Sequence, residues 1–191
     1  MNVPNILTVL RFLLIPVFAY YLCIEHYVVA VILFLAGGLT DVLDGYIARR
    51  YNLVTSWGKI ADPLADKLMQ MTALVILTSW GLPWSLNKIP IELLAIILAK
   101  EIFMGIGAIV LYKQDNYVVS ANWYGKIVTV VFYLAIVMLI FDKPFSQLIL
   151  LGLPFNRLFF LLAVFGALFA FFMYVRSYQK IKKNKGRQPE K

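Results

Sequence analysis

The chain has 191 residues, of which 62% are hydrophobic and only 15% are charged, and its formal net charge is +8. About a quarter of the residues in a soluble domain are usually charged, so this composition excludes an ordinary soluble protein. Cys23 is the one cysteine, which excludes an internal disulfide and metal sites built on several thiolates. The apolar residues fall in blocks of about 20, long enough to cross a hydrocarbon layer. The sequence therefore predicts an integral membrane protein.

Six apolar blocks are predicted to cross the membrane. They cover residues 8–24, 27–48, 58–80, 89–112, 122–141 and 157–175. A backbone inside lipid finds no external hydrogen-bonding partner, so each crossing must be a helix or a strand of a closed barrel. These blocks lack the alternation that is typical of barrel strands, which leaves an all-α bundle of six transmembrane helices.

Basic residues predict the orientation of this bundle. They concentrate between residues 49 and 59 and in the last residues of the chain, whereas the other side holds little beyond Lys88, Lys143 and Arg157. Because basic loops stay in the cytoplasm, both termini are expected there, with the bundle in the cell membrane. We expect a membrane domain that carries the chemistry over residues 1–178 and a basic cytoplasmic tail over residues 179–191. The tail would contact anionic lipid headgroups, and no nucleic-acid partner is expected.

Four acidic residues lie close together where the second block ends and the third begins. Asp41 and Asp44 have i,i+3 spacing, and Asp62 and Asp66 have i,i+4 spacing. Each spacing places both side chains on one helix face, and the short intervening loop makes the two helices antiparallel neighbours. A charge at membrane depth costs about 3 kcal/mol on insertion scales, and intramembrane acids usually mark function. The two pairs are therefore predicted to face each other in a functional site.

Four carboxylates near a bilayer need a positive charge to neutralise them. Oxygen ligands without His or Cys suit Mg²⁺ or Mn²⁺ better than zinc. Two such ions about 4 Å apart would clamp the attacking and leaving oxygens of a phosphoryl transfer. The alternative is an interfacial salt-bridge network with the basic residues nearby, namely Arg49, Arg50, Lys59 and Lys67.

Glycines and an arginine beside these acids suit a phosphate ligand. Gly45 follows Asp44 and Gly58 lies one turn before Asp62, and glycine lets a ligand approach the backbone closely. Arg49 can hold a phosphate with its planar fork. Together these residues form the pattern Asp41-x2-Asp44-Gly45-x2-Ala48-Arg49-x8-Gly58-x3-Asp62-x3-Asp66.

This pattern resembles the signature of the CDP-alcohol phosphatidyltransferase family, with every fixed position filled. The resemblance implies a phosphatidyl transfer from CDP-diacylglycerol to a small alcohol, with the four aspartates holding two divalent ions. It also implies that Asp66 is the general base that takes the proton from the attacking hydroxyl. By the same resemblance the protein is expected to be a homodimer.

The resemblance also implies which residues bind CDP-diacylglycerol. The run Pro4-Asn5-Ile6-Leu7-Thr8-x2-Arg11 resembles a second family element, in which Asn5 and Thr8 help to bind the nucleotide. Without the resemblance, Asn5 and Thr8 would be interpreted as a helix cap and its neighbour. The remaining residues implied at the CDP-diacylglycerol are Gly45, Arg49, Thr55 and Gly58.

The acceptor alcohol is predicted from shorter runs. Asp62-Pro63-Leu64-Ala65-Asp66-Lys67 and Gly125-Lys126-x2-Thr129 resemble the branch of the family that uses glycerol 3-phosphate. A phosphorylated acceptor needs basic partners, and the candidates are Lys67, Lys100 and Lys126. That branch usually shows Ala-Arg-Glu in the fourth helix, where this chain has Ala99-Lys100-Glu101, and lysine keeps the charge without the bidentate fork. A contact of Lys100 with Glu101 or with an aspartate inside the bundle is the alternative role for that lysine.

Two other functions stay open at this point. A related branch uses phosphatidylglycerol as the acceptor and makes cardiolipin, and its lipid acceptor should need less basic charge in the pocket. A divalent-cation channel or transporter belongs to a different class, because acids in membrane helices often line ion paths. The channel hypothesis predicts acids spread across the depth of the bilayer, whereas these four are expected near one face.

Overall fold

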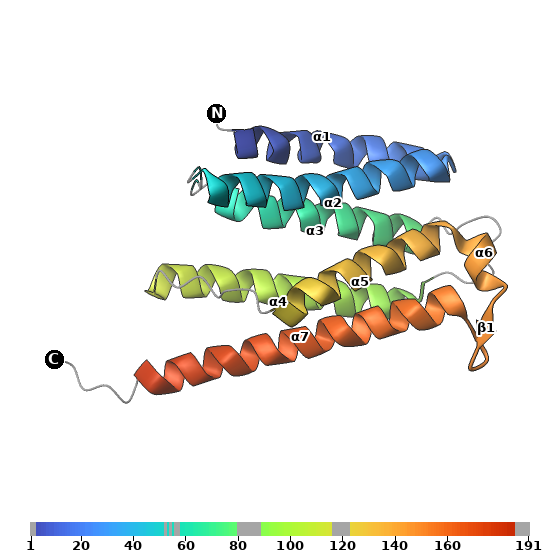
Figure 1. The fold of residues 1–191 in the computed structure, drawn as a ribbon. Coiled ribbons are helices and arrows are strands. Elements are labelled where there is room, and N and C mark those ends of the chain that lie inside the picture. Colours follow the sequence, from blue (N-terminus) through green and yellow to red (C-terminus); the bar gives the residue numbers. More distant parts are fainter. Residues whose placement is uncertain are drawn as a thin grey trace.

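The computed structural model describes residues 3–51, 53, 55, 58–79, 89–115 and 123–185, and nearly all of them are helical (Figure 1). Within these residues the helices are α1 (Val3–Cys23), α2 (Tyr27–Arg50), α3 (Gly58–Ser79), α4 (Ile91–Asp115), α5 (Trp123–Ile140), α6 (Asp142–Ser146) and α7 (Phe155–Lys185). Between α6 and α7, β1 (Ile149–Leu150) and β2 (Leu153–Pro154) pair as a short antiparallel hairpin. Each predicted block therefore coincides with a long helix.

In the described part of the chain, three helices are long and apolar enough to cross a membrane. These stretches are Pro4–Cys23, Tyr27–Ala48 and Phe155–Arg176, and α5 contains the shorter apolar stretch Ile127–Ile140. A helical chain with helices capable of spanning a membrane is therefore confirmed. The prediction of six crossings, with both termini in the cytoplasm, stays a prediction.

The start of α1 and the end of α7 differ most from the predicted block boundaries, each by five residues or more. α1 begins at Val3 rather than at residue 8, because Pro4 in its first turn has the fixed φ that favours a helix start. α7 continues to Lys185 rather than residue 175, through the proposed domain boundary at residue 178. Apolar blocks mark the part of a helix that suits lipid, and the backbone hydrogen bonds continue beyond it. Residues 186–191 of the expected tail lie outside the described residues.

The long helices form two layers. α1, α2 and α3 pack together in one layer, and α4, α5 and α7 lie in a second layer beneath it (Figure 1). α3 contacts both α4 and α5, so it joins the layers. The start of α1, the end of α2, the start of α3 and the end of α7 lie at the same end of the bundle, which we call the N-terminal end (Figure 1).

Two glycines of α2, one turn before Asp41, allow α3 and α5 to pack closely against this helix. A Cβ added at Gly37 would collide with the Met69 sulfur of α3. A Cβ added at Gly38 would lie 2.9 Å from the Cε1 atom of Tyr133 on α5. The Phe34 ring, one turn earlier, is fully buried and packs 4.7 Å from the Tyr133 ring between their centroids. Both α3 and α5 are thereby held against α2.

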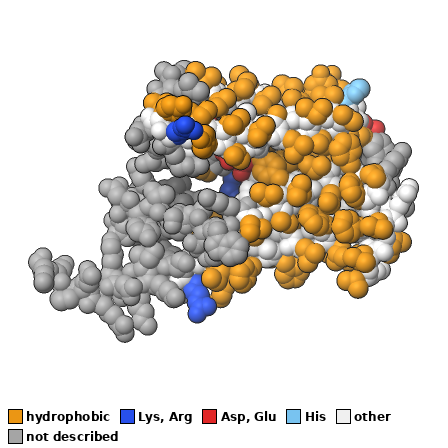
Figure 2. All heavy atoms as spheres, in the orientation of Figure 1, with side chains coloured by type: hydrophobic (Ala, Val, Ile, Leu, Met, Phe, Trp, Pro, Cys, Tyr) orange, Lys and Arg blue, Asp and Glu red, His pale blue; other side chains and the backbone are white. Residues whose placement is uncertain are grey.

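Apolar side chains cover most of the described surface on the face that Figure 2 shows. Residues that are more than half exposed include Leu13, Ile32, Leu39, Phe165 and Phe172. Large contiguous apolar surfaces on a folded chain suit contact with lipid or with another protein. In the same view, acidic and basic side chains are visible in a hollow beneath the upper layer (Figure 2).

Candidate active site

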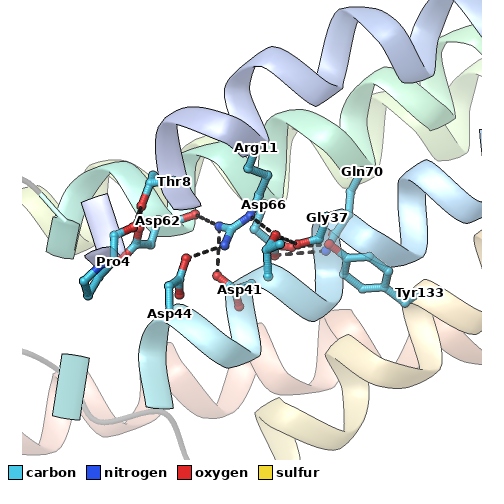
Figure 3. Close-up of polar contacts among 11 residues, drawn as sticks. Pro4, Thr8, Arg11, Gly37, Asp41, Asp44, Asp62, Asp66, Gln70 and Tyr133 are labelled. Atoms are coloured by element: carbon cyan, nitrogen blue, oxygen red, sulfur yellow. Dashed lines mark hydrogen bonds and ion pairs between the residues drawn. The ribbon is translucent and has the colours of Figure 1, made fainter. Parts of the chain in front are cut away.

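The four predicted aspartates lie around one buried arginine (Figure 3). Asp41 and Asp44 come from α2, Asp62 and Asp66 come from α3, and Arg11 comes from α1. As the i,i+3 and i,i+4 spacings predict, the two aspartates of each helix project from one face toward the neighbouring helix. The structure thus brings residues far apart in the sequence into one polar site within an apolar bundle.

Arg11 is the positive charge within this group. Its side chain is fully buried, with Nη2 2.5 Å from Asp44 Oδ2 and Nη1 3.0 Å from Asp41 Oδ1. Nη1 also lies 3.4 Å from the Asp62 carbonyl oxygen, and Nε lies 3.4 Å from Thr40 Oγ1. A buried charge needs partners of this kind, since an unpaired one is strongly destabilising. Arg11 therefore joins α1 to both α2 and α3.

The basic residues considered for a salt-bridge network do not supply this charge where they are described. Lys67 pairs with Glu101, and the exposed Arg50 donates a hydrogen bond of 2.5 Å to the Tyr46 hydroxyl. The side chains of Arg49 and Lys59 lie outside the described residues. The arginine that contacts the acids is Arg11 of α1, a residue to which the sequence alone assigned no role.

Asp62 is held by the start of α1. The Thr8 hydroxyl donates a hydrogen bond to Asp62 Oδ1 and also lies 3.1 Å from the Pro4 carbonyl oxygen. Thr8 is fully buried. The structure therefore places Thr8, expected near the nucleotide, directly against one of the acids.

Asp66 accepts hydrogen bonds on both of its oxygens. Tyr133 Oη on α5 donates to Oδ1, and Gln70 Nε2, one turn further along α3, donates to Oδ2 over 3.1 Å. Neither donor was predicted from the sequence. Gln70 carried a weak signal, a polar residue at i,i+4 from Asp66 within an apolar helix. With both oxygens engaged, the orientation of this carboxylate is fixed from two helices.

Asn5, Thr55 and Gly58 form a small polar cradle beside Asp62. Thr55 Oγ1 donates to Asn5 Oδ1 over 3.0 Å, and the Gly58 N–H donates to Thr55 Oγ1 over 3.0 Å. A Cβ added at Gly58 would meet Thr55 Oγ1 at 3.0 Å, Asn5 Oδ1 at 3.4 Å and Asp62 Oδ2 at 3.5 Å. These residues, expected at the CDP-diacylglycerol, therefore converge. Gly45 lies next to Asp44 on α2, whereas the Arg49 side chain is outside the described residues.

Two of the three lysines expected at the acceptor, Lys67 and Lys100, lie between α3 and α4. Lys67 and Lys100 both form ion pairs with Glu101, the second with 2.5 Å between Lys100 Nζ and Glu101 Oε1. Lys100 and Glu101 are largely buried, with side-chain exposures of 10% and 11%. The alternative contact between Lys100 and Glu101 is thus present, and Lys67 joins it. The Lys126 side chain lies outside the described residues.

The donor set of the site fits a hard divalent cation. The four aspartates offer only oxygen ligands, which suits Mg²⁺ or Mn²⁺. One guanidinium among four ionised carboxylates leaves a net charge of −3 by formal charges, so the site still attracts cations. Within the described residues no three acidic, His or Cys side chains already converge as a metal cluster. Donors from the protein hold the carboxylates instead.

Comparisons with known proteins agree with this geometry. The model of the CDP-alcohol phosphatidyltransferase family matches residues 1–172. A relative from Bacillus subtilis (strain 168) is 34% identical over 180 residues, covering 86% of this chain and 88% of the relative, and is named CDP-diacylglycerol–glycerol-3-phosphate 3-phosphatidyltransferase. A protein of the same name from Aquifex aeolicus (strain VF5) is 36% identical over 129 residues, covering 68% of this chain and 70% of its own. Because the match to the family model extends from the first residue to residue 172, within α7, the chain belongs to the CDP-alcohol phosphatidyltransferase family.

Proposed function

We propose that this protein transfers the phosphatidyl group of CDP-diacylglycerol to glycerol 3-phosphate, giving phosphatidylglycerophosphate and CMP. The observation that carries the reaction class is the group of four aspartates from α2 and α3 beside the cradle of Asn5, Thr55 and Gly58. The acceptor is supported by the names of the relatives from Bacillus subtilis and Aquifex aeolicus, which specify glycerol 3-phosphate.

The aspartates would hold two divalent ions, Mg²⁺ or Mn²⁺. When bound, such ions neutralise a diphosphate and stabilise the charge that develops on its leaving oxygen. The residues proposed as ligands are Asp41, Asp44, Asp62 and Asp66. Their oxygen-only chemistry and the residual negative charge of the group support this role.

Asp66 would act as the general base. The acceptor hydroxyl oxygen forms a bond to the phosphorus that carries diacylglycerol, the bond from that phosphorus to the CMP oxygen breaks, and the hydroxyl proton passes to Asp66. A carboxylate is a weak base near neutral pH, so its contribution depends on placement close to the hydroxyl. Tyr133 and Gln70 supply that placement, because they hold both carboxylate oxygens.

The cytidine diphosphate part would lie against α1, the end of α2 and the start of α3. The proposed contacts are Asn5, Thr8, Gly45, Arg49, Thr55 and Gly58. Convergence of Asn5, Thr55 and Gly58 beside Asp62 supports this assignment. Because Gly58 has no side chain, the oxygens of Thr55, Asn5 and Asp62 stay uncovered on its side of the cradle.

Replacing Gly58 with alanine is expected to raise the KM for CDP-diacylglycerol about tenfold, since its methyl group would press on the oxygens of Thr55 and Asn5. Steady-state kinetics in detergent micelles measures this. Gly105→Ala on α4 is the matched control, because nothing lies within 4 Å of a Cβ added there. Equal KM values for the two variants would contradict the cradle assignment.

The phosphate of the acceptor would bind beside α3 and α4. Lys67 and Lys100 share Glu101, so one positive charge is left over for an anionic ligand. Lys126 is the third proposed contact. A phosphorylated acceptor suits this excess of lysine better than phosphatidylglycerol does, although the cardiolipin reaction is the second candidate to test. The acids gather at one site rather than along the bundle, which disfavours a cation channel.

The position of the site supports a cytoplasmic active centre in the cell membrane. The end of α2 and the start of α3, which carry the aspartates, lie at the same end as the start of α1 and the end of α7 (Figure 1). The basic residues of the sequence concentrate at this end, and basic segments stay in the cytoplasm. A membrane domain of residues 1–178, a basic tail and a homodimer complete the proposal.

A direct assay tests the function. The purified protein is given CDP-diacylglycerol, Mg²⁺ and one acceptor at a time, namely glycerol 3-phosphate, phosphatidylglycerol, inositol phosphate or serine. Mass spectrometry of the lipids is expected to find phosphatidylglycerophosphate with the first acceptor only. Cardiolipin from phosphatidylglycerol would establish the second candidate, and no CMP release with any acceptor would refute the enzyme assignment.

The variant Lys67→Met tests whether Lys67 helps to bind the phosphate of the acceptor. It removes one ammonium group and leaves Lys100 balanced by Glu101, so no positive charge is left over and the KM for glycerol 3-phosphate should rise about tenfold or more. The KM for CDP-diacylglycerol should change less than about twofold. Lys67→Arg keeps the charge and serves as the control. A parallel rise of both KM values would argue against a separate acceptor subsite.

A further inference from the structure

Arg11 makes two ion pairs from within the apolar helix α1. Its guanidinium does not grip one carboxylate with both nitrogens. Nη1 reaches Asp41 and Nη2 reaches Asp44, so the group spans the space between the two acids. A divalent ion bridging Asp41 and Asp44 would compete for those same oxygens.

The surroundings of Arg11 keep it there. Its side chain is fully buried and Asp44 is 1% exposed, whereas Asp41 is 40% exposed. Two further hydrogen bonds from the guanidinium are accepted by Thr40 Oγ1 and by the Asp62 carbonyl oxygen. Such a group cannot turn toward water without breaking contacts on two helices, so its charge stays with the acids.

Thr8 lies three residues before Arg11 on the same face of α1. Through these two side chains, α1 donates hydrogen bonds to Asp62, Asp41 and Asp44. The first helix therefore supports three of the four acids without any bound ion. This arrangement would keep the carboxylates gathered when they would otherwise repel one another.

We infer that Arg11 is a built-in counter-ion of the aspartate group, a positioning residue that holds Asp41 and Asp44 together without metal and weakens divalent-cation binding there. This inference rests on the proposed function, which assigns divalent ions to these aspartates. Arg11 carries one of the positive charges that the carboxylates need. A bound divalent ion must share the oxygens with it, and loss of the arginine leaves a more negative site.

The test measures Mn²⁺ binding directly rather than turnover. Electron paramagnetic resonance of free Mn²⁺ gives its dissociation constant for the purified full chain in micelles. The Mn²⁺ dissociation constant of Arg11→Gln is expected to be at least about tenfold lower than that of the unchanged protein, because a nearby positive charge is gone. Arg50→Gln removes the same charge from an exposed position and should change binding less than about threefold.

Thermal unfolding supplies the second readout. Without metal, Arg11→Gln should unfold at a lower temperature than the unchanged protein, and saturating Mn²⁺ should raise its midpoint more than it raises that of the unchanged protein. A variant that only lost packing would show the first effect without the second.

Arg11→Lys keeps the inference testable if Arg11→Gln does not fold. Lysine preserves the charge, so its Mn²⁺ dissociation constant should stay within about threefold of the unchanged protein, while its metal-free midpoint falls because one of the two ion pairs is lost. Folded Arg11→Gln with unchanged or weaker Mn²⁺ binding would overturn the inference, as would a tenfold change in Arg11→Lys. If the unchanged protein binds no Mn²⁺ at all, the metal part of the proposed function fails instead.

Discussion

Asp66→Asn is expected to lower kcat by about 10²- to 10⁴-fold, the usual contribution of a general base. The amide has the same shape as the carboxylate and its oxygen can still accept the Tyr133 hydrogen bond. Its NH₂ group would face the Gln70 donor, so one hydrogen bond is lost and the fold is retained. The rate of CMP release at saturating substrates measures the effect.

Asp142→Asn makes the same chemical change away from the site. Asp142 begins α6 and is buried, with the Asn156 amide donating to it over 2.5 Å. This control should keep turnover within about threefold of the unchanged protein. If Asp66→Asn turned over as fast as the control, Asp66 would not be the base.

Asp44→Ala is expected to destabilise the protein by about 3–5 kcal/mol in the absence of metal, because it leaves a buried guanidinium without its closest partner. Of its two carboxylate partners Arg11 would keep Asp41, which is the more exposed of the two acids. The thermal midpoint in micelles should fall by about 10 °C.

Glu92→Ala provides the control for the loss of one acid. Glu92 is exposed in the first turn of α4, and its removal should shift stability by less than about 0.5 kcal/mol. The stability of Asp44→Asn, which keeps a hydrogen-bond acceptor, should lie between those of Asp44→Ala and Glu92→Ala. An Asp44→Ala variant as stable as Glu92→Ala would show that the Arg11–Asp44 pair does not support the fold.

The aspartate group was predictable because the signal is local. Asp41 and Asp44 share a helix face by their spacing, as do Asp62 and Asp66, and a short loop brings the two helices together. Acids inside apolar blocks are costly and therefore informative. The structure adds that these carboxylates face donors from other helices.

Those donors were not predictable, since they come from distant parts of the sequence. Tyr133 lies on α5, in an apolar block where tyrosine carries no signal of its own, and its approach to Asp66 depends on the absence of a side chain at Gly38. Arg11 belongs to the N-terminal run that resembles a family element, but only the packing of α1 against α2 shows which acids it contacts. The contact of Lys67 with Glu101 likewise requires knowing that α3 and α4 are neighbours.

The fold shows a similar division. The six apolar blocks locate the long helices because lipid-compatible composition extends over many residues. Short elements inside the polar break before α7, namely α6 and the β1–β2 hairpin, escaped prediction. Their geometry depends on single residues, such as Gly152 with its positive φ of 77°.

The hydrogen bond from Tyr133 to Asp66 has a mechanical consequence. It crosses from the lower layer of helices to the upper one, as does the Lys67–Glu101 ion pair between α3 and α4. Sliding of one layer over the other would strain both contacts at once. Under the proposed function, α3 therefore carries both the general base and a lysine of the acceptor subsite, so a shift of this helix would move the two together.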